Sequence, residues 1–137
     1  MENLKIIRTN SENIDFIDLV RDLDQYLANI DGEEHSFYAQ YNKLDQIKHC
    51  VILYVDTIPV SCGAFKWHEN EKVEVKRMYT RPEFRGRNFA KKVLEELEKW
   101  AIENGFSTCV LETGKRQESA VKLYQNMGYN IIPNYGQ

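Results

Sequence analysis

Cysteine is scarce in this sequence, with three residues among 137, and no two of them form a C-x-x-C pair. Cys50, Cys62 and Cys109 all lie in strand-like runs, which predicts reduced and mostly buried thiols of a cytoplasmic protein. The three histidines have no metal-ligand spacing among themselves or with the cysteines. The sequence therefore argues against a disulfide-stapled domain, and we expect no metal.

Long apolar runs and an excess of positive charge are also missing. No run approaches the roughly 20 apolar residues of a membrane-spanning helix, and residues 1–8 are too short and too polar a stretch for a signal peptide. The formal net charge of −3 argues against a nucleic-acid-binding protein that relies on a basic surface. We expect a cytoplasmic protein with no nucleic-acid or membrane partner.

What the sequence does have is the composition of an ordinary globular protein, 42 % hydrophobic and 28 % charged. Its length suits a single domain over residues 1–137. Helical periodicity predicts amphipathic helices over 13–30, 87–104 and 117–127, and a short helix over 33–41. β-Branched and alternating stretches predict strands at 4–9, 50–55, 60–67, 73–80, 107–113 and 129–132, with turns at 56–59 and 68–72. This order implies an α/β fold whose sheet is mixed, with a central hairpin followed by parallel crossovers.

The most informative segment joins the strand at 73–80 to the helix that follows it. Gly86, directly after Arg85, lets the backbone approach a ligand closely because it has no side chain. The helix starts within a residue or two, so its free N–H groups and the positive end of its dipole lie at the loop. This arrangement suits a pyrophosphate. An ordinary strand-to-helix turn with a solvated basic face is the alternative. The spaced glycines of the P-loop and of the Rossmann fingerprint are absent.

Three ordered motifs give the chain a family resemblance. Residues 85–90, Arg-Gly-Arg-Asn-Phe-Ala, resemble the R/Q-x-x-G-x-G/A motif of the GNAT superfamily of N-acetyltransferases, which bind acetyl-coenzyme A (acetyl-CoA). Residues 123–129, Leu-Tyr-Gln-Asn-Met-Gly-Tyr, resemble its L-Y-x-x-x-G-F/Y segment, and Leu-Glu-Thr-Gly at 111–114 followed by Gln117 is typical of a bacterial branch. The resemblance covers about residues 50–135. It implies the GNAT acyl-CoA N-acyltransferase fold, a central mixed and mostly antiparallel β-sheet flanked by helices, with acetyl-CoA as co-substrate.

The same resemblance assigns a coenzyme site. The end of the strand at 73–80 is expected to bind the pantetheine arm through its backbone. The loop that follows this strand and the first turn of the helix at 87–104 are expected to bind the pyrophosphate. The expected cofactor-binding residues are Met78, Tyr79, Thr80, Arg85, Gly86, Arg87, Asn88, Phe89, Ala90, Lys91 and Gln117. Asn88 replaces the first glycine of the motif, and asparagine tolerates the left-handed conformation well. Apolar alternation that breaks at Arg77 predicts a β-bulge near 76–77, with an edge strand that has a wet face as the alternative.

Amine acetylation needs a proton acceptor for the amine and a proton donor for the departing thiolate. By resemblance, Tyr124 has the donor role near the expected position of the sulfur, and a core aromatic residue is the alternative. Glu74 matches the position of the general base in the histone-acetylating branch. An ion pair with Lys76, or ordered water as the base, remains open. The candidates for lining the acceptor site are the aromatic residues Tyr26, His35 and Tyr38.

The acceptor implied by the resemblance is a primary amine of a small molecule or peptide, acetylated in a ternary complex, and the acidic balance favours a cationic one. The competing interpretation is a non-catalytic acyl-CoA-binding or interaction module of the same fold. The last strand of the family's sheet is expected to be short or missing at the end of this sequence. An open sheet edge favours association, so the sequence favours a homodimer.

Overall fold

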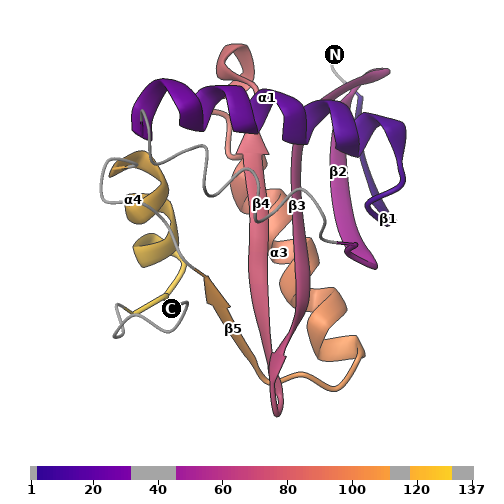
Figure 1. Ribbon diagram of the computed structural model, residues 1–137, viewed down its shortest axis with the longest axis vertical. Helices are drawn as coiled ribbons and strands as arrows, with labels where there is room; N and C mark the ends of the chain where they lie inside the picture. Colours follow the sequence, from indigo (N-terminus) through magenta and orange to yellow (C-terminus); the bar gives the residue numbers. More distant parts are fainter. Residues whose placement is uncertain (1–2, 32–45, 112–117, 131–137) are drawn as a thin grey trace.

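The computed structural model describes residues 3–31, 46–111 and 118–130 (Figure 1). The strands are β1 (Leu4–Thr9), β2 (His49–Val55), β3 (Ile58–Glu69), β4 (Lys72–Thr80) and β5 (Thr108–Leu111). The helices are α1 (Ile14–Asp31), α3 (Phe89–Glu103) and α4 (Glu118–Asn126), with a short 3₁₀ turn at Pro82–Phe84. The α/β order expected from the sequence is present in this part of the chain.

Within the described residues, five strands form one sheet in the order β1-β2-β3-β4-β5. The first four pair antiparallel, and β4 pairs in parallel with β5 after the crossover through α3. The sheet is thus mixed and mostly antiparallel, as the sequence predicted. In Figure 1, α1 crosses one face of the sheet and α3 lies behind the sheet, against the opposite face.

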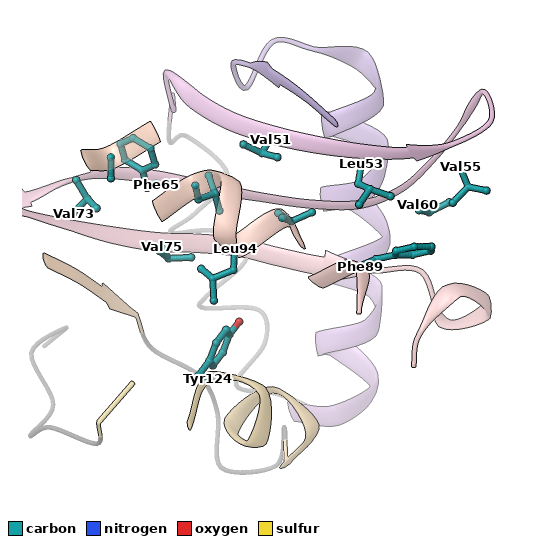
Figure 2. Packing of buried hydrophobic residues seen from close by; sticks show 13 residues of the cluster. Val51, Leu53, Val55, Val60, Phe65, Val73, Val75, Phe89, Leu94 and Tyr124 are labelled. Carbon is teal, nitrogen blue, oxygen red and sulfur yellow. The ribbon is translucent and has the colours of Figure 1, made fainter. Parts of the chain in front are cut away.

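Two apolar clusters hold the helices to the two faces of the sheet. The cluster between α1 and the sheet comprises Phe16, Leu19, Leu23, Ile47, Cys50, Ile52, Cys62, Ala64 and Tyr79. The cluster under α3 and α4 includes Val51, Leu53, Phe65, Val73, Val75, Val93, Leu94, Leu97 and Tyr124 (Figure 2). Because side chains alternate across a strand, β2, β3 and β4 each contribute to both clusters. Burial of this apolar area favours folding by roughly 25 cal/mol per Å².

The two hairpin turns are shorter than the sequence patterns predicted. The β2–β3 turn occupies only residues 56–57, so Pro59 lies in β3 rather than in the turn. Asp56 has a φ of 56°, the left-handed geometry that two-residue hairpin turns require. The β3–β4 turn occupies only residues 70–71, and Asn70 has a φ of 49°. Both turn predictions were too long because cross-strand pairing continues to Ile58 and Pro59 in the first hairpin and to Glu69 and Lys72 in the second.

Side-chain and glycine caps mark several ends of the described helices. Asn13 Oδ1 accepts the backbone N–H groups of Asp15 (2.9 Å) and Phe16 (3.2 Å) at the start of α1. Gly105 and Gly128 follow α3 and α4 with φ values of 88° and 94°. Glycine adopts this left-handed geometry without steric cost, so these positions end the two helices.

The predicted irregularity in β4 is present. The β3–β4 register shifts so that Gly63 alone opposes Arg77 and Met78, and Arg77 has a φ of 58°. A Cβ atom at Gly63 would lie 2.9 Å from Leu97 Cδ1 and 3.0 Å from Val93 Cγ1. Glycine at this position therefore allows α3 to pack directly against the bulge.

Two predicted elements lie wholly or partly outside the described residues. The short helix over 33–41 lies outside them, as do residues 131–132 of the predicted last strand. Tyr129 and Asn130, the first two residues of that strand, are not in a strand. The Tyr129 N–H instead donates to the Tyr124 carbonyl (3.0 Å) at the end of α4. The prediction of a strand that starts at Tyr129 is therefore wrong at its start, because Gly128 turns the chain back onto the helix.

Candidate functional site

The edge of β4 that faces away from β3 is only partly covered by another strand. Its parallel partner β5 pairs with Lys72–Val75, and within the described residues no strand pairs with that edge over residues 76–80. Figure 1 shows β5 diverging from β4 toward α4. Backbone N–H and C=O groups need partners. An extended ligand that carries amide groups can supply them in the manner of an added strand.

Backbone direction determines which residues face this open edge. The Arg81 N–H donates to a β3 carbonyl (2.9 Å), and the Ser61 hydroxyl of β3 donates to the Tyr79 carbonyl (3.0 Å). Because N–H and C=O groups alternate sides along a strand, Met78 and Thr80 direct theirs away from β3. Of the three residues expected to contact pantetheine, Met78 and Thr80 thus present backbone to the open edge, whereas Tyr79 faces β3.

The loop after β4 ends in a left-handed residue directly before α3. Gly86 has a φ of 80°, and Asn88 has φ 64° and ψ 20°, so Asn88 adopts the conformation that the sequence predicted it to tolerate. The first backbone bond of α3 runs from the Lys92 N–H to the Asn88 carbonyl (3.1 Å). The N–H groups of residues 89–91 therefore have no acceptor within the helix, and the Asn88 side chain makes no capping bond.

The first turn of α3 has the electrostatic character of an anion site. It carries no acidic residue, and Lys91 and Lys92 are exposed on it, so the positive end of the helix dipole is not offset within the turn. Phe89 is buried in the core, and Ala90 is half-buried, so these two residues contribute backbone rather than side chain to the loop. The helix begins at Phe89 rather than at Arg87 because Asn88 is left-handed.

The two arginines of the motif lie over aromatic rings. The guanidinium carbon of Arg87 is 5.7 Å from the ring centres of both Phe84 and Phe89. Arg85 turns back toward the sheet, and its guanidinium carbon lies 4.6 Å from the ring centre of Tyr26 on α1. Arg85 Nε also donates to the Thr80 carbonyl (2.8 Å). One carbonyl of the open edge is therefore already bonded to the protein itself.

Tyr124 reaches from α4 into the core beneath α3. Its side chain is buried, and Figure 2 shows its ring directed from α4 toward Leu94 and β4. Burial raises the pKa of the Tyr124 hydroxyl to about 12, so this group stays protonated at neutral pH. The hydroxyl makes no hydrogen bond to the part of the chain that the structure describes. A buried donor without a partner is costly, by about 1–3 kcal/mol, unless a ligand accepts from it.

Glu74 lies in the covered half of β4, opposite Lys66 of β3 and beside β5. Its neighbours Val73 and Val75 point into the core under α3, so the half-buried Glu74 side chain projects from the face that α1 crosses. Tyr124 belongs to the cluster on the opposite face. The two residues expected to be catalytic therefore lie on opposite faces of the sheet.

Some predicted site residues lie outside the described residues, namely Gln117, His35 and Tyr38.

The structure adds two residues near the loop that the sequence patterns did not single out. Asp22 of α1 forms an ion pair with Arg81, and Arg81 Nε donates to the Pro59 carbonyl (2.8 Å). Helical spacing is the signal that could have found this contact, because Asp22 and Tyr26 are four residues apart and share one face of α1.

The cysteines do not offer an alternative nucleophile. Cys50, Cys62 and Cys109 are free thiols, as predicted, and burial raises the pKa of each, to about 12 for Cys50. A thiol held in its protonated form is a poor nucleophile.

Among the residues that the structure describes, no group of His, Cys, Asp and Glu side chains is placed to hold a metal ion. None of the helices in those same residues is long and apolar enough to cross a membrane.

Known proteins with similar sequences give consistent matches. A sequence model of the acetyltransferase (GNAT) family matches residues 15–129. A protein named IAA acetyltransferase from Azospirillum brasilense is 31 % identical to this chain over 132 residues, which cover 94 % of this chain and 86 % of the relative.

Solved structures share the fold. A candidate acyl-CoA N-acyltransferase from Klebsiella pneumoniae superposes with a TM-score of 0.78 at 26 % identity, over 97 % of this chain and 87 % of the other. The PaiA N-acetyltransferase of Thermoplasma acidophilum, solved in complex with coenzyme A, superposes with a TM-score of 0.77 over 98 % of this chain and 94 % of the other. At 18 % identity the second likeness shows the fold alone.

Proposed function

The chain belongs to the acetyltransferase (GNAT) family, and we propose that it moves an acetyl group from acetyl-CoA to a primary amine of a small molecule or peptide. The observation that carries the proposal is the junction of β4 and α3. There the N–H groups of residues 89–91, which lack intrahelical acceptors, lie one loop away from the open backbone edge at Met78 and Thr80. An anionic pyrophosphate joined to an amide-bearing arm matches both features.

The residues of this junction fit each part of the coenzyme. The N–H groups of residues 89–91 would hold the pyrophosphate, and Gly86 permits the close backbone approach that this requires. Met78 and the Thr80 N–H would pair with the pantetheine amides. The positive charges of Arg87 and Lys91 favour the same anion. By the family resemblance, Gln117, which lies outside the described residues, would contact the pantetheine or the pyrophosphate arm.

The proposed reaction is direct transfer within a ternary complex. The neutral amine nitrogen attacks the thioester carbonyl carbon, a C–N bond forms, and the C–S bond breaks to release the coenzyme thiolate. Glu74, directly or through a water molecule, takes the proton that the amine loses. Backbone N–H groups near Met78 polarise the carbonyl oxygen as negative charge develops on it.

Tyr124 is the proposed donor to the departing sulfur. The raised pKa keeps the proton on its hydroxyl until negative charge appears nearby. A thiol is more acidic than this hydroxyl, so Tyr124 first stabilises the developing thiolate through a charge-assisted hydrogen bond. The proton that the thiolate finally retains passes through Tyr124, which regains one from water.

The proposed acceptor site involves Tyr26 together with His35 and Tyr38. Aromatic faces bind alkylammonium groups through cation–π contacts, which suits an amine that arrives protonated. Tyr26 already lies under one cation, the Arg85 guanidinium, within reach of the proposed coenzyme loop.

The second candidate function is a non-catalytic acyl-CoA-binding or interaction module of the same fold, which the replacement of a motif glycine by Asn88 favours.

The experiment that tests the proposal measures the release of free thiol from acetyl-CoA in the presence of single primary amines. The panel contains polyamines, aminoglycosides, amino acids and lysine-bearing peptides, and mass spectrometry identifies the product. We expect release that depends on one class of amine, with an N-acetylated product. Coenzyme binding without release for any amine in the panel would favour the non-catalytic module instead.

A further inference from the structure

Two residues of α1 contact the segment that carries the proposed coenzyme loop. Asp22 forms an ion pair with Arg81, and Tyr26 lies under the guanidinium of Arg85, 4.6 Å from its carbon to the ring centre. Asp22 and Tyr26 are one helical turn apart on the same face of α1. Arg81 and Arg85 bracket the short turn at Pro82–Phe84. These four residues, Asp22, Tyr26, Arg81 and Arg85, form what we call the arginine clasp.

Each arginine of the clasp is also fixed to the backbone of the sheet. Arg81 Nε donates to the Pro59 carbonyl, and Arg85 Nε donates to the Thr80 carbonyl, both at 2.8 Å. The Arg85 guanidinium carbon also lies 5.6 Å from the ring centre of Tyr79, whose ring is 6.3 Å from that of Tyr26. A planar guanidinium held by a backbone acceptor and two ring faces has little rotational freedom left. The clasp therefore fixes both ends of the segment 81–85 against α1.

We propose that the arginine clasp couples α1 to the coenzyme loop, so that α1 holds the loop in its binding conformation and coenzyme binding in turn orders α1. The identity of the ligand rests on the proposed function, whereas the ordering of the loop by α1 does not. Tyr26 belongs both to the clasp and to the proposed acceptor site. Because coupling between two sites is reciprocal, coenzyme binding would change the affinity for the acceptor by the same factor as the acceptor changes the affinity for coenzyme.

The size of the coupling is set by two modest contacts. The Asp22 side chain is 43 % exposed, and an ion pair with that exposure contributes little by itself. A partly exposed cation–π contact contributes a little more. Loss of both contacts should weaken coenzyme binding by about three- to tenfold, without abolishing it.

The test compares the double variant Asp22→Asn/Tyr26→Leu with matched controls. Asp18→Asn makes the same charge change on the same helix but breaks an ion pair with Arg21 (3.3 Å), which lies outside the clasp. Tyr26→Phe keeps the ring face and serves as the conservative rescue. Hydrogen exchange of α1 and of residues 81–92 is measured for each protein, free and saturated with coenzyme A, and calorimetry gives the coenzyme affinity.

In the free proteins, we expect residues 83–92 to exchange several-fold faster in the double variant than in wild type, Asp18→Asn or Tyr26→Phe. On adding coenzyme A, exchange across the second half of α1 should slow in wild type and in both controls, but not in the double variant. Equal loop exchange in all free proteins would overturn the proposal, and so would equal slowing of α1 in the double variant. Absence of coenzyme binding by wild type would instead count against the proposed function, while the free-state comparison still decides whether the clasp orders the loop.

Discussion

Tyr124 and Tyr129 are neighbouring tyrosines with different surroundings. Their ring centres are 5.9 Å apart. The Tyr129 hydroxyl donates to a Glu98 carboxylate oxygen (2.7 Å), whereas the Tyr124 hydroxyl has no partner among the described residues. The Tyr129 hydroxyl is therefore already engaged, whereas the Tyr124 hydroxyl is not bonded within the described part of the chain.

Tyr124→Phe removes the available donor and leaves the ring in the core. If Tyr124 donates to the departing thiolate, kcat should fall by about 10²-fold or more, while the Kd for acetyl-CoA stays nearly unchanged. Tyr129→Phe is the matched control, because it deletes a hydroxyl from the same cluster and should leave kcat within a few-fold of wild type. Steady-state kinetics and calorimetry give the two quantities. Equal kcat values for the two variants would contradict the role.

Glu74→Gln removes the proposed proton acceptor at nearly constant shape. We expect kcat/KM at neutral pH to fall by about 10²-fold and then to rise with pH as the amine loses its own proton, toward a typical amine pKa near 10. Glu71→Gln, in the exposed β3–β4 turn, is the control for loss of one carboxylate. The measurement is the pH profile of kcat/KM. A Glu74→Gln profile parallel to that of wild type would leave water alone as the base.

Sequence reasoning predicted single residues well where backbone geometry restricts the choice. Asn88 and the bulge at Arg77 are examples, because few residues tolerate a positive φ and a break in alternation is visible in the sequence. It did not predict that Arg85 turns back onto Tyr26 and the Thr80 carbonyl. That contact depends on where α1 crosses the sheet, which no local pattern encodes.

At the scale of elements, the β3–β4–α3 unit determines the shape of the proposed site. Gly63 allows α3 to approach the bulge, and the bulge sets which backbone groups of β4 face outward. The strand and helix order of this unit was predictable, because its periodicities are strong. The turn lengths and the exact start of α3 were not, because pairing across the sheet and the left-handed Asn88 decide them.

Gly63→Ala tests this packing. The added methyl would overlap Met78 Sδ most closely, and it would lie 2.9 Å from Leu97 Cδ1 and 3.0 Å from Val93 Cγ1, closer than van der Waals contact. We expect the free energy of unfolding to fall by about 1–3 kcal/mol, because a filled core must shift to accept the methyl group. Urea denaturation measures the change. A variant as stable as wild type would show that the surrounding side chains, Met78 among them, adjust at little cost.

At the scale of the whole molecule, the GNAT acyl-CoA N-acyltransferase fold and the family resemblance expected from the sequence are both confirmed. Two of the three motifs contain residues with left-handed backbone, Gly86 and Asn88 in one and Gly128 in the other, which few residue types adopt. That residues 1–137 form one domain, and that the chain associates as a homodimer, remain proposals. Sedimentation of the purified chain would decide the second.

Buried tyrosines make the stability of the whole molecule sensitive to alkaline pH. Burial raises the pKa of Tyr124 to about 12, and burial together with a hydrogen bond to Asp15 raises that of Tyr54 to about 12. The folded state holds these protons more tightly than the unfolded state, whose tyrosines have a pKa near 10. Stability is therefore fully present below about pH 10 and is lost as the pH rises toward about 12.

Denaturant unfolding across this pH range should show the loss directly. Tyr124 alone should contribute up to about 2–3 kcal/mol of it, so Tyr124→Phe should give a shallower decline than wild type. Parallel declines for the two proteins would mean that the Tyr124 hydroxyl ionises as readily in the folded state as in the unfolded state.

The measurement that tests the central claim most directly is calorimetric titration of the purified chain with acetyl-CoA, with dephospho-CoA and free adenosine as controls. The junction of β4 and α3 predicts saturable binding at micromolar concentration, with adenosine far weaker because it lacks both the pyrophosphate and the pantetheine arm. No heat of binding with acetyl-CoA at millimolar concentration would contradict the coenzyme site, and the proposed acetyl transfer would fall with it.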